Sequence, residues 1–437
     1  MTDFAAIILA AGKGTRMKSD MHKVLHPIAG KPMLMHILDE FEGLSPKQTV
    51  VVVGDRREQI DAAIEGREVV TALQDPQHGT AHAALQAKGA LEGFSGHVLV
   101  TFGDVPMVRA ETVQRLLGAL AEGAKVAVLG FKPEDALQYG RIIADDDGTV
   151  RKMVEFKDAT EREKKTRMCN SGLIVAHSDD MWPLLEAVDN DNAQGEYYLP
   201  DVATGAIARG DKVLVIECEP DEVAGINSRA ELAEAEQRWQ AARRVQAMDE
   251  GATLKAPDTV FFSHDTKLGR DVTVDPHVVF GPGVTVADGV HIKAYTHLEG
   301  ATLAKGAQAG PFARLRPGAV MEENSFIGNF VEMKKATLGP GAKASHLSRP
   351  VELRLPLSDF HTRSAFTRTA FAEVLATHDA AYVPLAPLFC DTRWCAVEDQ
   401  GVPLYSDDDH LSSVGADRVI DIFGAVFDAA PSGGNLP

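Results

Sequence analysis

The sequence is poor in cysteine and contains no long apolar run. Its four cysteines, Cys169, Cys218, Cys390 and Cys395, are too few and too scattered for a disulfide framework or a four-cysteine zinc site. No apolar stretch approaches the length that crosses a bilayer, and the N-terminal segment lacks a basic region followed by a cleavage site. These absences predict a cytoplasmic protein that makes no membrane contact.

Basic residues are also in short supply. The 437-residue chain has 44 Lys and Arg against 63 Asp and Glu, a net charge of −19. A general nucleic-acid binder needs a basic face to neutralise phosphates, so this balance argues against one, although small anionic ligands are compatible with local clusters of Lys and Arg. The length allows two or three domains, each with a sizeable core.

A glycine-rich turn follows the first apolar run, but it lacks the full form of either familiar phosphate motif. AAIILAAGKGTRM has no GKS or GKT, as a Walker A loop requires, and Met17 stands where a dinucleotide fingerprint has its third glycine. Gly12 and Gly14 permit close approach of a phosphate, and Arg16 and Lys23 supply positive charge. Taken alone, the two glycines are better explained by an ordinary strand-to-helix turn.

The pattern along the chain predicts two kinds of architecture separated by a helix. Short apolar runs alternate with helical patterns from residue 4 to about 227, which indicates βα units on a mostly parallel sheet. Ser228 and Glu231 have capping-box spacing, and good helix formers continue to Gly251. We therefore expect a helical connector over residues 228–250.

Beyond the connector the hydrophobic period becomes six residues. Such a repeat, with one inward apolar residue per step, is typical of a hexapeptide β-helix, and a two-sheet sandwich, the alternative, gives no reason for a step of six. The residues in phase are Val272, Val278, Val284, Val290, Val320, Phe326 and Leu338, with Pro276, Pro282 and Asp288 on the same step.

Several further blocks occur in a fixed order with the glycine-rich turn. LAAGKGTRMKSDMHKVLHPIAGKPML, LQDPQHGTAHAA, TFGDVPM, YGRII, VEFKDA, CNSG and EVAGINSR together resemble the sugar 1-phosphate nucleotidylyltransferases, and most closely the uridylyltransferase half of the bifunctional GlmU family. That family acetylates glucosamine 1-phosphate and then makes UDP-N-acetylglucosamine for cell-wall precursors. The resemblance implies the substrates UTP and N-acetylglucosamine 1-phosphate and the cofactor Mg²⁺.

The resemblance also implies roles for individual residues. Asp104 and Asn227 would hold the metal, Arg16 and Lys23 would face the triphosphate as catalytic groups, and Phe102 stands where many relatives have Tyr. The remaining substrate contacts would come from the nucleotide loop, the uracil site, the strand before Asp104 and the sugar site: Leu9, Ala10, Ala11 and Gly12; Gln74, Gly79 and Thr80; Gly103; Gly140, Glu155 and Asn170.

The chemistry that follows needs no protein nucleophile. The phosphate oxygen of the sugar phosphate would attack the α-phosphorus of UTP in line and release pyrophosphate. Positioning and cations that stabilise developing negative charge supply most of such catalysis. A nucleotidylyltransferase for another sugar or nucleotide is the alternative enzyme, because the glycine-rich loop and Asp104 are widely shared.

After the hexads, ARLRPGA, GNFVEMKKA and KASHLS resemble the start of the acetyltransferase site of the same family. The resemblance makes Arg316 and Lys334 ligands of glucosamine 1-phosphate and His346 the proton acceptor in attack on acetyl-CoA. The family continues with Tyr where this chain has Arg349, and no TCNYDG-like block follows. We therefore expect acetyl transfer to be absent or impaired.

The six-residue beat stops after Ser348. LFCDTRWCAVEDQGVPLYSDDDHLSSVGA resembles the last segment of the SGNH-type domain attached to membrane acyltransferases, in which Asp407 and His410 would be the DxxH pair. The nucleophilic serine of that family lies in a GDS block, which this sequence lacks. Cys390 and Cys395 would stay reduced in a cytosolic chain.

These patterns predict an α/β fold. It comprises a Rossmann-like nucleotidyltransferase domain over 1–227, the linker 228–250, a truncated left-handed parallel β-helix over 251–348 and an unrelated α/β tail over 349–437. Hexapeptide prisms usually assemble as trimers, so we expect a homotrimer if the shortened prism assembles. An SGNH-type esterase and a scaffolding protein built on the β-helix are the hypotheses of other classes.

Overall fold

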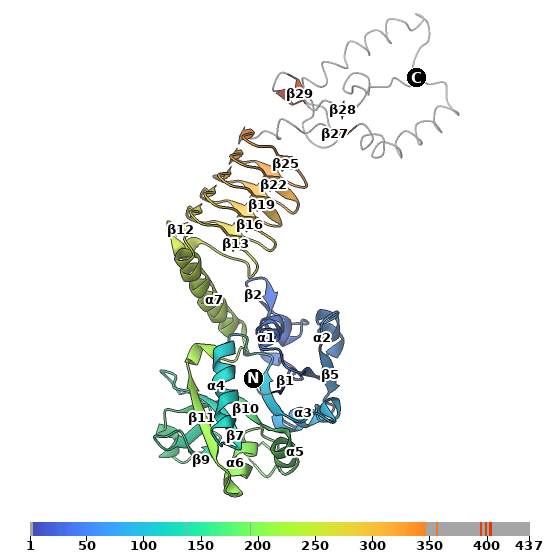
Figure 1. The fold of residues 1–437 in the computed structure, drawn as a ribbon, viewed down its shortest axis with the longest axis vertical. Helices are drawn as coiled ribbons and strands as arrows, with labels where there is room; N and C mark the ends of the chain where they lie inside the picture. Colours follow the sequence, from blue (N-terminus) through green and yellow to red (C-terminus); the bar gives the residue numbers. More distant parts are fainter. Residues whose placement is uncertain are drawn as a thin grey trace, which may run out of the picture. The chain divides into compact units, whose positions relative to one another are not determined.

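The structure is a computed structural model of the whole chain, in which two compact units divide at residue 240. It describes residues 3–136, 138–192 and 194–346, together with the short strands β27 (Leu355–Pro356), β28 (Trp394–Cys395), β29 (Glu398–Asp399) and β30 (Val402–Pro403) (Figure 1). Cys390, Asp407 and His410, on which the sequence hypothesis for the tail depends, lie outside the described residues.

The N-terminal unit is built on one mixed sheet, in which β10 is an antiparallel strand among parallel ones. Its order is β11-β7-β10-β6-β1-β4-β5, with β8 paired to β10 and β9 to β8. Strand β10 runs antiparallel to both neighbours, while β1 is parallel to β4 and β6. The bounds are β1 Phe4–Leu9, β4 Gln48–Val53, β5 Val70–Leu73, β6 His97–Phe102, β7 Val126–Phe131, β8 Arg141–Ala144, β9 Val150–Val154, β10 Cys169–His177 and β11 Val213–Cys218.

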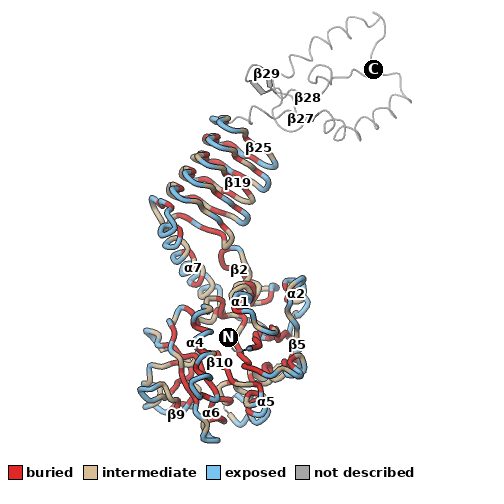
Figure 2. Tube along the Cα trace, viewed as in Figure 1, coloured by how far each residue is buried: buried red, intermediate tan, exposed pale blue. Residues whose placement is uncertain are grey.

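Helices cover both faces of this sheet because its central strands are apolar on both sides. In β1, Ala6 and Ile8 pack in one core cluster with α1, α2 and α4, while Ile7 and Leu9 pack in a second with α3, α5 and α6. Figure 2 shows the resulting buried centre and exposed helix surfaces. The helices are α1 Met33–Glu42, α2 Arg57–Ala63, α3 Thr80–Gln86, α4 Ala110–Ala121, α5 Ser178–Glu186 and α6 Asp201–Ala208.

Adjacent parallel strands β1 and β6 end at the same edge of the sheet. Leu9 lies opposite Phe102 in the register, and the amide of Gly103 donates a 2.9 Å hydrogen bond to the carbonyl of Leu9. The glycine-rich turn after β1 and the loop carrying Asp104 after β6 therefore emerge side by side. Ligands of open α/β sheets gather at this carboxyl edge.

Helix α7 (Arg229–Asp249) begins with the capping box expected from the sequence. The amide of Glu231 donates to Ser228 Oγ at 3.2 Å, and Glu231 Oε2 accepts from the amide of Ser228 at 2.8 Å. Each side chain thus satisfies a backbone N–H that has no partner within the helix. On its first turns, Ala235 packs in a small core with Ile28 and Met33, next to the hairpin of β2 (Pro27–Ile28) and β3 (Lys31–Pro32).

Strands β12 to β26 of the C-terminal unit form three parallel sheets, which confirms the parallel β-helix. The first contains β12 Thr253–Leu254, β14 Thr273–Val274, β17 His291–Ile292, β20 Gln308–Ala309, β23 Phe326–Asn329 and β26 Lys343–His346. The second contains β13 Lys267–Leu268, β16 Thr285–Val286, β19 Ala301–Leu303, β22 Ala319–Met321 and β25 Thr337–Leu338. The third contains β15 Val279–Phe280, β18 His297–Leu298, β21 Arg314–Leu315 and β24 Glu332–Met333.

The expected phase of the repeat is correct for the first coils and at Leu338, but wrong at Val320 and Phe326. Val272, Val278, Val284, Val290 and Leu338 are buried as predicted, but Val320 and Phe326 are only partly buried.

A change in coil length explains the error. Thr273 pairs with His291 eighteen positions later, whereas His291 pairs with Gln308 only seventeen positions later. The shorter coil moves the inward row of Val284 and Val290 one residue back, from Val320 and Phe326 to the buried Ala319 and Ser325.

Aromatic rings form a column along the outside of the β-helix. His277, Tyr295, Phe312 and Phe330 each have a positive φ, and successive rings stack with centroids 4.8, 4.9 and 5.4 Å apart. A left-handed backbone is unfavourable for such residues, so ring stacking between coils offsets part of the strain.

Candidate functional site

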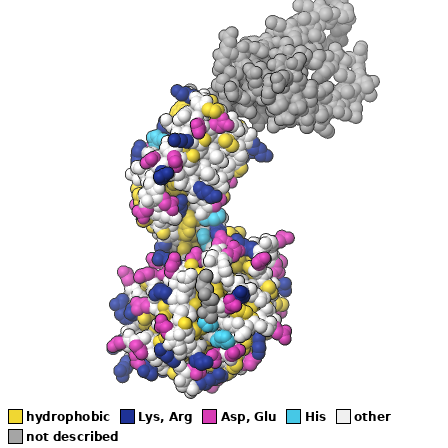
Figure 3. Space-filling view, viewed as in Figure 1, with side chains coloured by type: hydrophobic (Ala, Val, Ile, Leu, Met, Phe, Trp, Pro, Cys, Tyr) yellow, Lys and Arg dark blue, Asp and Glu magenta, His cyan; other side chains and the backbone are white. Residues whose placement is uncertain are grey.

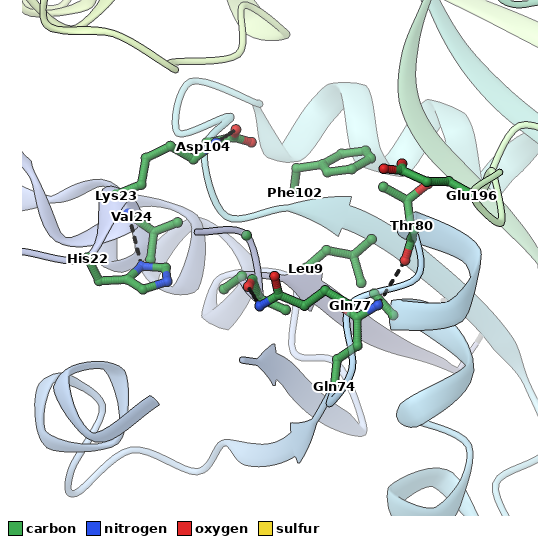
Figure 4. Close-up of a pocket in the computed structure, with 15 residues that line it drawn as sticks. Leu9, His22, Lys23, Val24, Gln74, Gln77, Thr80, Phe102, Asp104 and Glu196 are labelled. Carbon is green, nitrogen blue, oxygen red and sulfur yellow. Dashed lines mark hydrogen bonds and ion pairs between the residues drawn. The ribbon is translucent and has the colours of Figure 1, made fainter. Parts of the chain in front are cut away.

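A cavity of about 290 Å³ opens at the carboxyl edge of the N-terminal sheet. Figure 4 shows the ends of β1 and β6 meeting there with the segment before α3. The lining residues are Leu9, Ala10, Ala11, Gly12, His22, Lys23, Val24, Gln74, Gln77, Gly79, Thr80, Ala83, Phe102, Asp104 and Glu196. The cavity thus collects residues that the sequence analysis assigned to the nucleotide, the uracil and the metal.

Lys23 joins the two residues predicted to hold a metal. Its ammonium forms an ion pair with Asp104 Oδ2 and donates a 3.1 Å hydrogen bond to Asn227 Oδ1 (Figure 4 shows the ion pair). The Lys23 and Asp104 side chains are only 14 and 16% exposed. Asp104 and Asn227, which lie far apart in the sequence, therefore direct their oxygens at one cation.

Backbone hydrogen bonds and a helix cap hold these two oxygen ligands in place. The amide of Ile226 donates to the carbonyl of Asp104 at 2.9 Å, which ties the segment of Asn227 to the end of β6. Glu231 Oε2 accepts from the amide of Asn227 at 2.6 Å in addition to its capping bond. The start of α7 thus fixes the backbone from which the Asn227 side chain extends.

The glycine-rich turn wraps around Lys23. Gly14 has φ 59°, and the loop continues into a short 3₁₀ turn at Thr15–Met17. Arg229 Nε donates to the carbonyl of Met17 at 3.3 Å and so anchors the end of the loop. Arg16, predicted to face the triphosphate, is exposed and is not among the residues that line the cavity.

The predicted uracil site is organised around a tight approach of two chain segments. Gln74 Nε2 donates to the carbonyl of Gly79 at 2.9 Å, and Thr80 Oγ1 accepts from the amide of Leu199 at 2.9 Å. A Cβ on Gly79 would lie 2.5 Å from the carbonyl oxygen of Tyr197. Only glycine fits there, so the turn into α3 depends on that residue.

The predicted sugar residues form a second cluster that reaches the cavity through Phe102. The amide of Asn170 donates to the carbonyl of Gly140 at 2.9 Å, and a Cβ on Gly140 would lie 3.2 Å from Glu155 Oε1. Asn170 Oδ1 accepts from the amide of Gly172 at 3.0 Å, and Gly172 packs directly against the Phe102 ring. Gly140, Glu155 and Asn170 therefore lie together.

Burial changes the proton affinity of two groups in this region. It raises the pKa of Glu155, and the nearby carboxylates of Asp201 and Asp158 raise it further. Burial also lowers the pKa of His22, and the adjacent Lys23 charge adds to this shift. The neutral forms of both side chains are favoured relative to water.

The sequence analysis missed some lining residues of the cavity, notably His22, Gln77 and Glu196. Gln77 Nε2 donates to the carbonyl of Ala11 at 2.6 Å, which links the glycine-rich loop to the segment before α3. Gln77 lies within the LQDPQHGTAHAA block, and His22 directly precedes Lys23. Their closeness in sequence to predicted site residues is the signal that could have found them. Glu196 is remote in sequence and carries no such signal.

The residues predicted for acetyl transfer lie on the last described coils of the β-helix. Arg316 follows β21 and donates to Glu332 Oε1 at 2.9 Å, while Lys334 follows β24 in the next coil and is exposed. His346 ends β26, where it is paired in register with Asn329. Figure 3 shows acidic and basic side chains interspersed over the visible face of this unit.

The donor set of Asp104 and Asn227 fits Mg²⁺. Among the described residues no group of three or more His, Cys, Asp or Glu side chains could hold a metal. Mg²⁺, however, binds proteins through one or two hard oxygen ligands and completes its shell with water and phosphate. The Lys23 ammonium acts as a stand-in cation and shows that the two oxygens converge.

No helix in the described part of the chain combines the length and the apolar character that crossing a bilayer requires.

Comparison with known proteins defines the class of the N-terminal unit and shows what the C-terminal region is similar to. Residues 6–199 match the MobA-like NTP transferase domain, so the sheet and its carboxyl-edge cavity are those of a nucleotidyltransferase. Residues 329–425 match the SGNH domain that is fused to AT3 domains. The second match begins inside β23 and therefore overlaps the last coils of the β-helix.

Full-length relatives identify the family. The chain is 57% identical over 346 residues to the bifunctional protein GlmU of Sphingopyxis alaskensis, a match that covers 79% of this chain and 76% of the relative. It is 58% identical over 352 residues to that of Rhizorhabdus wittichii, covering 80 and 78%. The GlmU of Zymomonas mobilis is 50% identical over 349 residues, covering 79 and 78%. The chain belongs to the bifunctional GlmU family.

Proposed function

We propose that the chain transfers UMP from UTP to N-acetylglucosamine 1-phosphate, giving UDP-N-acetylglucosamine and pyrophosphate. The observation that carries the proposal is the convergence of Lys23, Asp104 and Asn227 at the mouth of a glycine-lined cavity. A cation site next to backbone that a phosphate can approach suits a reaction between two phosphorylated substrates. Membership of the GlmU family supports the same reaction.

Different groups of residues suit different parts of the two substrates. The cavity between Gln74 and Thr80 offers amide and hydroxyl groups suited to the edge of a base, and the cluster of Gly140, Glu155 and Asn170 suits the hydroxyl groups of a neutral sugar. Phe102 separates the two, so the phosphates of both substrates would meet beside Lys23. Within this arrangement the sugar phosphate attacks in line, and no protein nucleophile takes part.

Asp104 and Asn227 are the residues that would hold Mg²⁺, which when bound supplies a Lewis acid for the developing negative charge. Lys23 neutralises phosphate oxygens from the opposite side as a flexible point charge. Arg16 lies exposed on the glycine-rich loop, so its side chain would have to turn toward the triphosphate to contribute. The chain's own residues thus bind and orient the two substrates and neutralise the negative charge of their phosphates.

The test is pyrophosphate release by the purified full chain from UTP and N-acetylglucosamine 1-phosphate. We expect Asp104→Asn to reduce kcat/KM at least a hundredfold, because the variant loses a metal ligand with its charge. Asp61→Asn, on the exposed face of α2, is the matched control and should leave the rate unchanged. Equal activity of Asp104→Asn and the wild type would exclude the proposed site.

A transferase for another sugar nucleotide uses the same loop and carboxylate. Parallel assays with other NTPs and sugar 1-phosphates separate the two readings. Faster turnover with dTTP and glucose 1-phosphate than with UTP and N-acetylglucosamine 1-phosphate would favour the alternative.

The second family activity, acetyl transfer to glucosamine 1-phosphate, is a separate question. We propose that it is weak or absent, because residues after 348 resemble an SGNH segment and carry no TCNYDG-like block. Arg316, Lys334 and His346 would then be the remaining part of that site. Acetylation of glucosamine 1-phosphate by acetyl-CoA at a rate comparable with uridylyl transfer would contradict this proposal.

Two further proposals concern the oligomeric state and the C-terminal region. We propose a homotrimer formed through the β-helix, which sedimentation would test. We also propose no esterase activity, because the sequence has no GDS serine for Asp407 and His410 to serve. Ester hydrolysis that survives Asp104→Ala and disappears with His410→Ala would contradict the second statement.

A further inference from the structure

The contact between Lys23 and its two acceptors has a consequence for metal binding. Its ammonium occupies the carboxylate oxygen of Asp104 and the amide oxygen of Asn227 at the same time. These are the oxygens that a divalent cation would need. We propose that Lys23 competes with the divalent cation in the nucleotide-free protein, and that phosphate groups remove this competition by drawing the ammonium away.

Geometry makes simultaneous occupation unfavourable. A Mg²⁺ ion lies about 2.0–2.1 Å from its oxygen ligands, and an ammonium lies about 2.8 Å from its acceptors. Two cations on the same pair of oxygens would be only a few ångströms apart and would repel strongly. Both side chains are largely buried, so solvent screens this repulsion less than at an open surface. The ammonium has to leave when the metal binds.

The local structure allows the ammonium to move while the backbone stays fixed. Lys23 begins the 3₁₀ turn Lys23–Leu25, and its Cβ packs against Gly14, so the base of the side chain is held. Beyond Cβ the side chain is a flexible chain of methylenes. The glycine-rich loop contacts Lys23 through Gly14, and phosphates approaching that loop offer the ammonium new acceptors.

This exchange couples the two ligands. A nucleotide that attracts Lys23 exposes the oxygens of Asp104 and Asn227, and a metal that displaces Lys23 makes its charge available to phosphate. By linkage, each ligand raises the affinity for the other. The inference rests on the proposed function for the identity of the anionic ligand, but the competition itself is a property of three residues in the nucleotide-free chain.

The experiment measures Mn²⁺ binding to the nucleotide-free full chain by electron paramagnetic resonance of the free ion. Lys23→Met removes the competing charge while keeping an unbranched side chain, and we expect it to bind Mn²⁺ about tenfold more tightly than the wild type. Lys13→Met is the matched control, because Lys13 is an exposed lysine of the same loop. It should change the affinity less than about twofold.

A double variant tests whether the gain in Mn²⁺ affinity depends on Asp104. Adding Asp104→Asn to Lys23→Met should abolish the gain, since the neutral amide cannot replace the carboxylate. Lys23→Gln carries the same prediction if Lys23→Met does not fold, with circular dichroism as the check. In crystals of the nucleotide-free wild type soaked in Mn²⁺, anomalous scattering between Asp104 and Asn227 should be weaker than in the Lys23 variant.

Unchanged or weaker Mn²⁺ binding in both Lys23 variants would overturn the inference. So would an equal gain in Lys13→Met, because the effect would then reflect total charge. Either result leaves the proposed function intact if the wild type still releases pyrophosphate from UTP and N-acetylglucosamine 1-phosphate. If the wild type does not catalyse that reaction but Lys23→Met still binds Mn²⁺ more tightly, the proposed function is rejected. The competition between Lys23 and the divalent cation is then still supported.

Discussion

Gly14 lies so close to Lys23 that a Cβ at residue 14 would be 2.7 Å from the Lys23 Cβ. The same glycine has φ 59°, in the left-handed region that other residues avoid. Two independent constraints, backbone conformation and the space left by Lys23, therefore require glycine at this point of the loop. The position of the Lys23 ammonium at Asp104 depends on this contact.

Gly14→Ala is accordingly expected to reduce uridylyl transfer at least tenfold and to destabilise the fold by about 1–2 kcal/mol, the range for a strained left-handed residue. Steady-state kinetics and thermal unfolding measure the two effects. Gly118→Ala is the control: Gly118 is exposed within α4, and nothing lies within 4 Å of an added Cβ. It should raise stability by up to about 1 kcal/mol and leave activity unchanged.

Glu231→Ala tests the support of Asn227 by the start of α7. The substitution removes the acceptor for the amides of Asn227 and Ser228. We expect the Mg²⁺ concentration for half-maximal activity to rise roughly tenfold, as is typical when an outer partner of a metal ligand is lost. Stability should fall by about 1 kcal/mol. Glu234→Ala, exposed on the next turn, should alter neither; a similar Mg²⁺ requirement in both variants would contradict the positioning role.

Gly172→Ala tests the boundary between the sugar cluster and the cavity. An added Cβ would lie 2.4 Å from Cε2 of Phe102, so the ring must move toward the cavity, and φ 87° adds strain. We expect KM for both substrates to rise several-fold and the protein to lose about 1–3 kcal/mol of stability. Adding Phe102→Leu should recover part of the KM change. A double variant no better than Gly172→Ala would show that the backbone alone is responsible.

Glu155 should make the N-terminal unit less stable as the pH rises. Its ordinary pKa is 4.5, and burial, followed by Asp201 and Asp158, raises it in the fold. Between the ordinary and the raised pKa the folded protein binds more protons than the unfolded chain, so the free energy of unfolding falls with increasing pH. Glu155→Gln should therefore raise the thermal midpoint at pH 7.5 relative to the wild type, and this gain should shrink toward pH 4.

Glu163 provides a control, because its effect on stability should depend on pH in the opposite direction. A hydrogen bond from Lys152, followed by bonds from Thr160, lowers its pKa from 4.5 to about 2. Its carboxylate therefore stabilises the fold above the ordinary pKa, and this stabilisation is lost as the pH falls toward 2. Glu163→Gln should lower the midpoint at pH 7.5. The same sign of change in Glu155→Gln and Glu163→Gln at that pH would refute the assignment.

The aromatic column should stabilise the β-helix. Phe312 stacks on Tyr295 and Phe330 with centroids 4.9 and 5.4 Å apart, and its φ is 55°. Phe312→Ala should cost about 1–3 kcal/mol, since an aromatic pair contributes about 0.5–1.5 kcal/mol. Phe312→Gly should be less damaging by about 1 kcal/mol, because glycine relieves the left-handed strain. Unfolding of the C-terminal unit followed by circular dichroism measures both; an Ala variant as stable as the wild type would contradict the prediction.

Much of this fold could be predicted because its local signals agree. The apolar runs that became β1, β4 and β6 are bounded by turn residues, and the Ser228–Glu231 cap marks the start of α7. The period of six predicted the parallel β-helix. The phase failed at Val320 and Phe326 because a coil one residue shorter leaves no mark in composition, and a single missing residue exchanges inward for outward positions.

For the candidate site, the sequence predicted individual residues but not the contacts between them. The resemblance supplied Lys23, Asp104 and Asn227 as separate residues, but nothing in the sequence indicates that one ammonium contacts both oxygens. It likewise grouped Arg16 with Lys23, but only Lys23 lines the cavity. Glu196 lines the cavity only because the segment before α6 packs against the turn into α3, where Tyr197 contacts Gly79.

The sequence by itself determined the family, the class of each unit, and the order of elements along the chain. These follow from hydrophobic periods, caps and glycine-rich turns, which act over a few residues. Only the tertiary structure decided how the cavity closes, which side chains share a cation and where the coil length changes. Those features arise from contacts between residues far apart in the chain, such as Lys23 and Asn227, whose geometry depends on the packing of the whole unit.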